Sequence, residues 1–78
     1  MQAPDWNDQI AIDPGVQGGA PVITGTRVPI AVLVEAVAAG DAIEQVARSY
    51  RVTESQVRAA LAYAAELVRS ERAIALSG

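Results

Sequence analysis

One stretch constrains the backbone of this chain more than any other: Gly19-Ala20-Pro21-Val22-Ile23-Thr24-Gly25-Thr26-Arg27-Val28-Pro29-Ile30. Its glycines permit positive φ, and its prolines fix φ and remove backbone donors. Short β-branched runs lie between these constraints, and the stretch contains neither a nucleophile paired with a base nor a cluster of metal ligands. The stretch therefore specifies shape, which favours a module that binds over one that reacts.

A small β-ribbon of two or three short strands is expected over residues 10–28. Ile10-Ala11-Ile12 alternates apolar and small residues, as in a half-buried strand. Pro21-Val22-Ile23 and Thr26-Arg27-Val28 are further extended pieces, and Thr24-Gly25 is the bend between them. Isolated hairpins are marginal in water, so this ribbon must lean on helices or pair its edge with another copy of itself.

Two apolar stripes at helical spacing predict the first two helices. The first helix is expected over residues 29–39, and Gly40 ends it because glycine suits the C′ position of a helix. The second helix is expected to begin at Asp41, whose carboxylate can cap it, and to end near Ser49 or Tyr50. The stripes consist of Ile30, Leu33, Val34, Val37, Ile43, Val46, Ala47 and Tyr50.

A third helix is predicted to open at Thr53 and to extend to about Arg72 or Ala75. Thr53-Glu54-Ser55-Gln56 has the spacing of a capping box. Very few residues separate this helix from the second one, which is typical of a helix-turn-helix. That turn usually carries a residue that tolerates positive φ. Arg51 stands there instead, so either the turn has a different geometry or it costs roughly 1 kcal/mol of strain. The stripe of the third helix consists of Val57, Ala60, Leu61, Ala64, Leu67 and Val68.

Together these elements predict an α+β fold that is mainly α, with a short N-terminal β-ribbon followed by a three-helix bundle that contains the helix-turn-helix. Residues 10–75 are expected to form this single domain, and residues 1–9 a flexible arm. A chain of 78 residues without cysteine has a small core and no disulfide. Small domains of this kind often gain stability by oligomerising, so a homodimer or an obligate partner is expected.

The composition argues against catalysis and against a membrane span. The chain lacks histidine, cysteine and lysine, so a serine nucleophile would have no visible base. No spacing of its acids suggests a metal site, and neither a metal nor a cofactor is expected. The longest apolar run is far short of the roughly 20 residues that cross a bilayer. Because the N-terminus shows no signal-peptide pattern, a cytoplasmic protein is expected.

In a DNA-binding helix-turn-helix, the third helix would lie in the major groove and present its N-terminal residues. Arg58 could bind guanine, and Ser55 or Thr53 could meet phosphate. The candidate DNA-binding residues are Arg48, Arg51, Thr53, Ser55 and Arg58, and Ala59 and Ala62 are expected to point outward beside them. The alternative is a tri-helical scaffold or protein-interaction module with a merely solvated outer face. The net charge of −3 and the anionic Glu54 favour that alternative.

Residues 10 to about 66 resemble the domain-of-unknown-function family 433. The resemblance rests on residues 10–30, on Ala39-Gly40 followed by Ile43-Glu44 and Val46, and on residues 57–64. Its most specific piece is Gly-x-Pro-Val-Ile-x-Gly-Thr-Arg-Val-Pro. The positions that match the family motif are Gly19, Pro21, Gly25, Thr26, Arg27 and Pro29. The resemblance implies a short β-element followed by a helical bundle of helix-turn-helix type.

Arg27 has two interpretations within this motif. Its guanidinium could reach a partner's carboxylate or a phosphate, because its planar fork suits both anions. Alternatively, Arg27 forms an internal pair with Asp13 or another acid.

The resemblance also implies a function. Members of the family often look like antitoxins that are encoded beside a PIN-like ribonuclease toxin. By that resemblance the chain would neutralise the toxin and, as a dimer, bind operator DNA and repress its own operon. No catalytic residue is carried over, since the family has none established. A non-DNA-binding protein-interaction or dimerisation module is the alternative.

Overall fold

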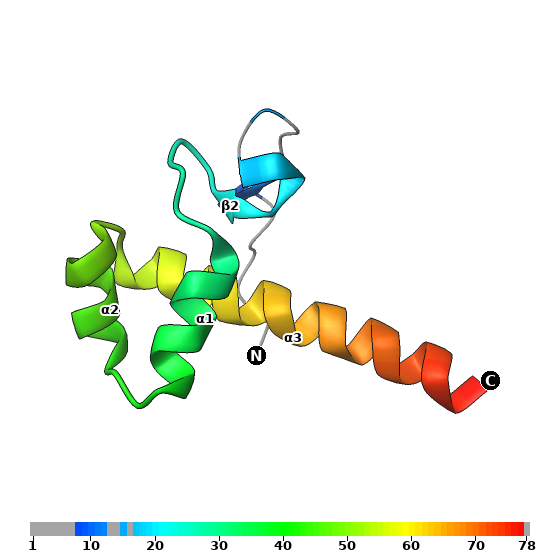
Figure 1. The fold of residues 1–78 in the computed structure, drawn as a ribbon. Helices are drawn as coiled ribbons and strands as arrows, with labels where there is room; N and C mark the ends of the chain where they lie inside the picture. The colour runs from blue at the N-terminus through cyan, green and yellow to red at the C-terminus, as the bar shows by residue number, and fades with distance from the viewer. Residues whose placement is uncertain (1–7, 13–14, 16, 78) are drawn as a thin grey trace.

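A computed structural model describes residues 8–12, 15 and 17–77 of the chain. Figure 1 shows a small β-ribbon beside three helices, the last of which projects well past the other two. The elements are β1 (Ile10–Ala11), a short 3₁₀ turn (Gln17–Gly19), β2 (Val22–Ile23), α1 (Ile30–Ala38), α2 (Ile43–Tyr50) and α3 (Glu54–Ser77). The predicted α+β, mainly α fold is confirmed. The flexible arm and the limits of the single domain stay predictions, because residues 1–7 lie outside the described part of the chain.

The centre of the ribbon is β2, which has neighbours on both sides. β1 pairs with it antiparallel, with Ile10 opposite Ile23. On the other side, the Ile23 N–H donates to the Val28 carbonyl at 3.0 Å, and Val22 forms an isolated bridge with Pro29. The sheet therefore has two strands, and the third extended piece predicted over Thr26-Arg27-Val28 is not a strand: only the Val28 carbonyl bonds to β2, and the bridge lies one residue later, at Pro29. This central place explains why Val22 and Ile23 are both buried.

A tight turn connects β2 to the segment that enters α1. The Thr26 N–H donates to the Ile23 carbonyl at 3.0 Å, and Gly25 has φ 79°, the sign that the third position of a type II turn requires. The Thr26 hydroxyl donates to the same carbonyl at 2.8 Å and accepts the Val28 N–H at 3.0 Å. Gly25 and Thr26 thus fix the direction in which the chain enters the first helix.

The end of α1 determines where α2 can begin. Gly40 has φ 106° and donates to the Val37 carbonyl at 3.0 Å, and the Asp41 N–H donates to the Ala36 carbonyl at 3.2 Å. This pair of bonds is a Schellman motif, in which Asp41 still belongs to the end of α1. The N-cap of α2 is Ala42, which makes no side-chain cap. The prediction that Asp41 caps the second helix is therefore wrong.

The end of α2 repeats the same motif without glycine. Arg51 adopts the left-handed conformation, with φ 58° and ψ 43°. The Val52 N–H donates to the Ala47 carbonyl at 3.0 Å, and the Arg51 N–H donates to the Arg48 carbonyl at 3.4 Å. Of the two alternatives for this turn, the structure has the usual geometry with an arginine in the strained position.

The beginning of α3 is the capping box that the sequence predicts. The Gln56 N–H donates to the Thr53 hydroxyl at 3.0 Å, and the Thr53 N–H donates to the Gln56 side-chain oxygen at 2.8 Å. Residues 51–53 are the whole connection between α2 and α3. These two helices and their three-residue turn are called the α2–α3 corner below.

The core lies where the ribbon and the three helices meet. Its buried residues are Ile23, Ile30, Leu33, Val46, Ala47, Val57 and Ala60. Ala59 is also fully buried, so the prediction that it points outward is wrong. Because Val57, Ala59 and Ala60 span a wide arc of α3, the first turns of this helix are enclosed on more than one side. No helix in the described part of the chain is long and apolar enough to span a membrane.

Candidate functional site

The first candidate surface is the α2–α3 corner, where all five predicted DNA-binding residues lie. Each of them is exposed. Arg48 is in the last turn of α2, Arg51 is in the connection, and Thr53 is the N-cap of α3. Ser55 and Arg58 follow in the first turns of α3. The corner thus combines three guanidinium groups and two hydroxyls, which are donors suited to phosphate and to base edges.

Three of these five side chains already have partners. The Arg58 guanidinium lies 3.3 Å from the Glu54 carboxylate, with both side chains about half exposed. The Thr53 hydroxyl accepts the Gln56 N–H, and the Ser55 hydroxyl donates to the Gln9 side-chain oxygen at 3.5 Å. An exposed ion pair contributes at most about 1 kcal/mol, so Arg58 can leave Glu54 at little cost. The Gln56 side-chain oxygen accepts the Thr53 N–H in the capping box, so it is not available to a ligand at the corner.

The residues of the family-like motif shape the ribbon and its junction with α1. Gly19 has φ 91°, another conformation that favours glycine. The Pro21 carbonyl accepts the Ile30 N–H at 3.0 Å, and Pro29 is the N-cap of α1 with φ −68°. Arg27 is exposed on the ribbon. Its predicted partner Asp13 lies outside the described residues, so both interpretations of Arg27 stay predictions.

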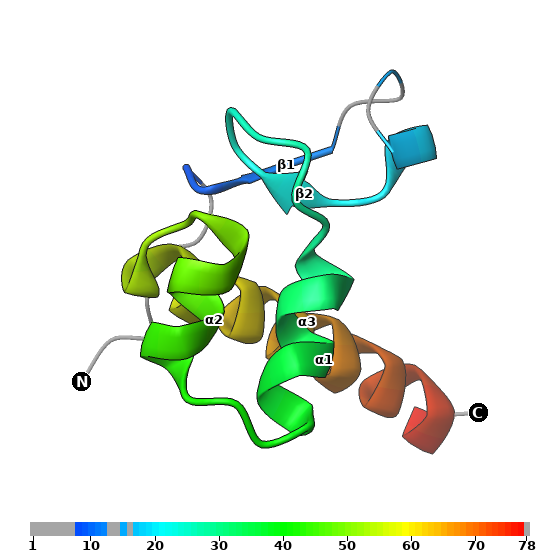
Figure 2. The same ribbon diagram turned by 60° about the vertical axis from the view of Figure 1, so that its left-hand side comes forward.

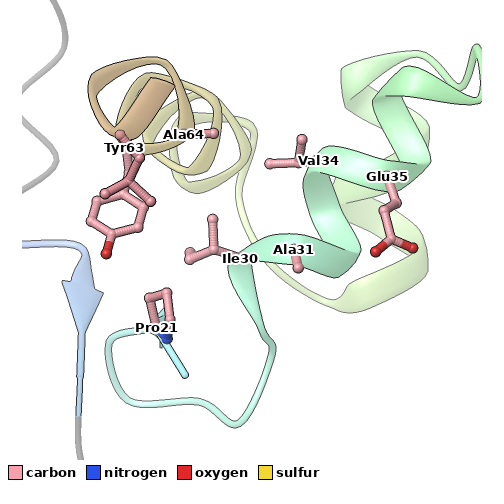
Figure 3. Close-up of a pocket in the computed structure, with 8 residues that line it drawn as sticks. Pro21, Ile30, Ala31, Val34, Glu35, Tyr63 and Ala64 are labelled. Atoms are coloured by element: carbon pink, nitrogen blue, oxygen red, sulfur yellow. The ribbon is translucent and has the colours of Figure 1, made fainter. Parts of the chain in front are cut away.

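The second candidate surface is an apolar groove between α1 and α3, beside the ribbon (Figure 3). It encloses about 360 Å³ and is lined by Pro21, Ile30, Ala31, Val34, Glu35, Tyr63, Ala64 and Leu67. Glu35 is the one charged residue among them, and Figure 3 shows its carboxylate directed away from the other side chains. Sequence reasoning missed this groove, because the residues that α1 and α3 contribute to its walls are more than twenty positions apart in the chain.

An exposed apolar ridge continues from the groove along α3. Leu67 is 47% exposed and Val68 is 62% exposed, although both belong to the stripe predicted to face the core. Helix α3 has 24 residues, so it is roughly 36 Å long. Figures 1 and 2 both show its C-terminal part extending beyond α1 and α2. The stripe thus continues to where the bundle ends, and Leu67 and Val68 leave about half or more of their surface exposed.

Comparison with known proteins identifies one family. A family model described as "Protein of unknown function (DUF433)" matches residues 10–64. Among solved structures, the chain is similar to the X-ray crystal structure of Rv2018 from Mycobacterium tuberculosis, with 36% sequence identity and a TM-score of 0.66. That match covers 74% of this chain and 28% of the Rv2018 chain, so this chain spans little more than a quarter of that relative's length. No curated protein matches the chain.

Proposed function

This chain belongs to the DUF433 family, and from that premise we propose that it is the antitoxin of a toxin–antitoxin pair. In this proposal it acts in the cytoplasm, neutralises a PIN-like ribonuclease and binds operator DNA as a dimer. The observation that carries the DNA-binding part is the α2–α3 corner. A three-residue turn between two helices, with Ser55 and Arg58 exposed on the otherwise enclosed first turns of the second helix, resembles the arrangement of a helix-turn-helix.

DNA binding would use the corner in two ways. Arg48 and Arg51 flank the turn and neutralise phosphates, which supplies most of the affinity and makes it salt-dependent. Arg58 leaves Glu54 and binds a guanine. A bidentate contact of this kind favours guanine over the other bases by about 1–3 kcal/mol. That gain exceeds the cost of breaking an exposed ion pair, which is at most about 1 kcal/mol.

A gel-shift titration with the DNA upstream of the chain's own gene tests this proposal. Arg58→Ala should weaken binding by about 1–3 kcal/mol, and Arg51→Ala should lower the slope of log K against log salt by about 1. Arg69→Ala is the matched control, because Arg69 is an exposed arginine on α3 that also pairs with a glutamate, Glu66, away from the corner. Absence of binding at low salt, or equal binding by all variants, contradicts the DNA-binding part.

The second candidate function is a protein-interaction or dimerisation module that does not touch DNA. The apolar groove and the exposed Leu67 and Val68 favour it, since contiguous apolar surface marks contact sites. The net charge of −3 and Glu54 at the corner favour it as well. Co-purification with the product of the neighbouring gene, together with no gel shift, would select this alternative. A neighbour that is not a ribonuclease would remove the toxin from the proposal.

A further inference from the structure

The ridge consists of Leu67 and Val68, and it adjoins the wall that α3 contributes to the groove. We propose that the groove and the ridge form one self-complementary interface, in which the ridge of each copy of the chain sits in the groove of a second copy. The inference rests on the dimer of the proposed function and names its contact surface. It does not depend on DNA or toxin binding.

Self-complementarity follows from the position of both surfaces on α3. Tyr63, Ala64 and Leu67 form the α3 wall of the groove, and Leu67 also begins the ridge. A two-fold axis across this part of α3 places two copies of the helix side by side and antiparallel. Each ridge then meets the other copy's groove, and the contact closes with two molecules.

A contact of this kind would stabilise the exposed part of α3. All residues from 65 to 70 are exposed, and the helix continues to Ser77. Isolated helices shorter than about 12–15 residues are marginal in water, so a distal segment of this length, although it continues a packed helix, has little stability of its own and would gain from packing. A second copy supplies that packing at the place where the bundle of the first copy ends.

The charge distribution also favours a second copy at this face. With a net charge of −3, two copies repel each other over most approaches. The ridge is uncharged, and the carboxylate of Glu35 is directed away from the rest of the groove. On α3 itself, Glu66 and Arg69 pair with each other and belong to neither the groove nor the ridge. Among the side chains that the structure describes, those of the groove and the ridge therefore place no like charges opposite each other.

The size of the surface is compatible with a weak dimer. The distal 13 residues of α3, from 65 to 77, form a rod roughly 20 Å long and 10–12 Å across. Each copy thus offers a patch of a few hundred Å², and two ridges in two grooves approach the roughly 1,000 Å² of a specific interface. A dissociation constant in the micromolar range or weaker is expected.

Sedimentation equilibrium of the full chain tests the inference. The parent should be in reversible monomer–dimer equilibrium. Leu67→Glu and Val68→Glu should each weaken the dimer by at least about 100-fold, because a two-fold interface contains the substitution twice. Ala65→Glu is the matched control, since Ala65 is an exposed apolar residue on α3 outside both the groove and the ridge. This variant should dimerise like the parent.

Circular dichroism on the same samples gives a second measurement. Helicity per residue should fall when the parent or Ala65→Glu is diluted below its dissociation constant, and Leu67→Glu should already show the lower value. A cooperative urea transition in Leu67→Glu shows that its bundle is still folded. A parent that is monomeric at all concentrations, even if its groove binds another protein, overturns the inference, as does a Leu67→Glu variant that dimerises normally. A dimer that depends on Leu67 but gives no gel shift supports it and contradicts only the DNA-binding proposal.

Discussion

At the scale of single residues, the C-terminal ends of α1 and α2 can be compared with each other. α1 and α2 both close with a Schellman motif, and the left-handed position holds Gly40 in one and Arg51 in the other. A side chain in the left-handed region costs of order 1 kcal/mol or more, whereas glycine adopts it freely. The end of α2 is therefore strained by one side chain, and this side chain is a candidate DNA-binding residue.

Arg51→Gly should raise the free energy of unfolding by about 0.5–1 kcal/mol, because it removes this strain. The same substitution three residues earlier, Arg48→Gly, lies inside α2 and should lower the free energy of unfolding by about 1 kcal/mol. Urea denaturation of both variants measures the difference in sign. If Arg51→Gly is destabilised as much as Arg48→Gly, the turn does not hold Arg51 under strain.

A second prediction at this scale concerns Thr26, whose hydroxyl both donates to the Ile23 carbonyl and accepts the Val28 N–H. Thr26→Ala should lower the free energy of unfolding by about 1–2 kcal/mol, since two hydrogen bonds of the turn are lost. Thr26→Ser keeps the hydroxyl and should recover most of that loss. Thr24→Ala, at an exposed position two residues away, should change stability by less than about 0.5 kcal/mol. Equal effects of the two alanine substitutions in urea unfolding would count against this role.

At the scale of secondary-structure elements, a helix end that depends on one local motif could be predicted from the sequence. A residue that two motifs could use was assigned wrongly. The capping box of α3 was predicted correctly because it needs only Thr53 and Gln56 at a fixed spacing. Asp41 was assigned wrongly because two motifs compete for it. Its N–H closes α1, and a sequence pattern does not show which helix has priority.

Burial on α3 could be predicted only in part, for a reason of the same kind. The periodicity correctly predicted that Val57 and Ala60 face the core. Ala59 is buried as well, because elements distant in the sequence cover a second side of α3. Leu67 and Val68 were predicted to face the core with the rest of the stripe, but they are exposed, because the periodicity does not show where the bundle ends. The groove between α1 and α3 was not predicted for the same reason.

The capping box also gives a prediction at this scale. Thr53→Ala should lower the free energy of unfolding by about 1 kcal/mol, because the Gln56 N–H loses its acceptor, and Thr53→Ser should restore it. Thermal unfolding followed by circular dichroism measures both. If the alanine variant unfolds at the parent's temperature, water satisfies the first turn of α3 as well as Thr53 does.

At the scale of the whole molecule, one long helix connects the two candidate surfaces. The α2–α3 corner is at the N-terminal end of α3, whereas the groove and ridge involve residues 63–68, past the core residues Val57 and Ala60. A partner that docks on the distal part of α3 therefore leaves the first turns of this helix open. The family match ends at residue 64, so the distal residues 65–77 lie outside it. DNA binding and dimerisation can thus be tested by separate substitutions on one helix.

A pair of identical substitutions distinguishes the core of one molecule from its contact with another. Leu33 is fully buried, and Leu67 is 47% exposed on the ridge. Leu33→Ala should cost about 2.7–5 kcal/mol at every protein concentration, a large part of the roughly 4–12 kcal/mol expected for a chain of this size. Leu67→Ala should cost much less in dilute samples, and its cost should grow as the parent is concentrated, because the dimer buries the exposed half of Leu67 and dimers stabilise by mass action. Urea unfolding at two concentrations a hundredfold apart separates the two cases. A Leu67→Ala cost that is independent of concentration would mean that Leu67 acts within the single chain.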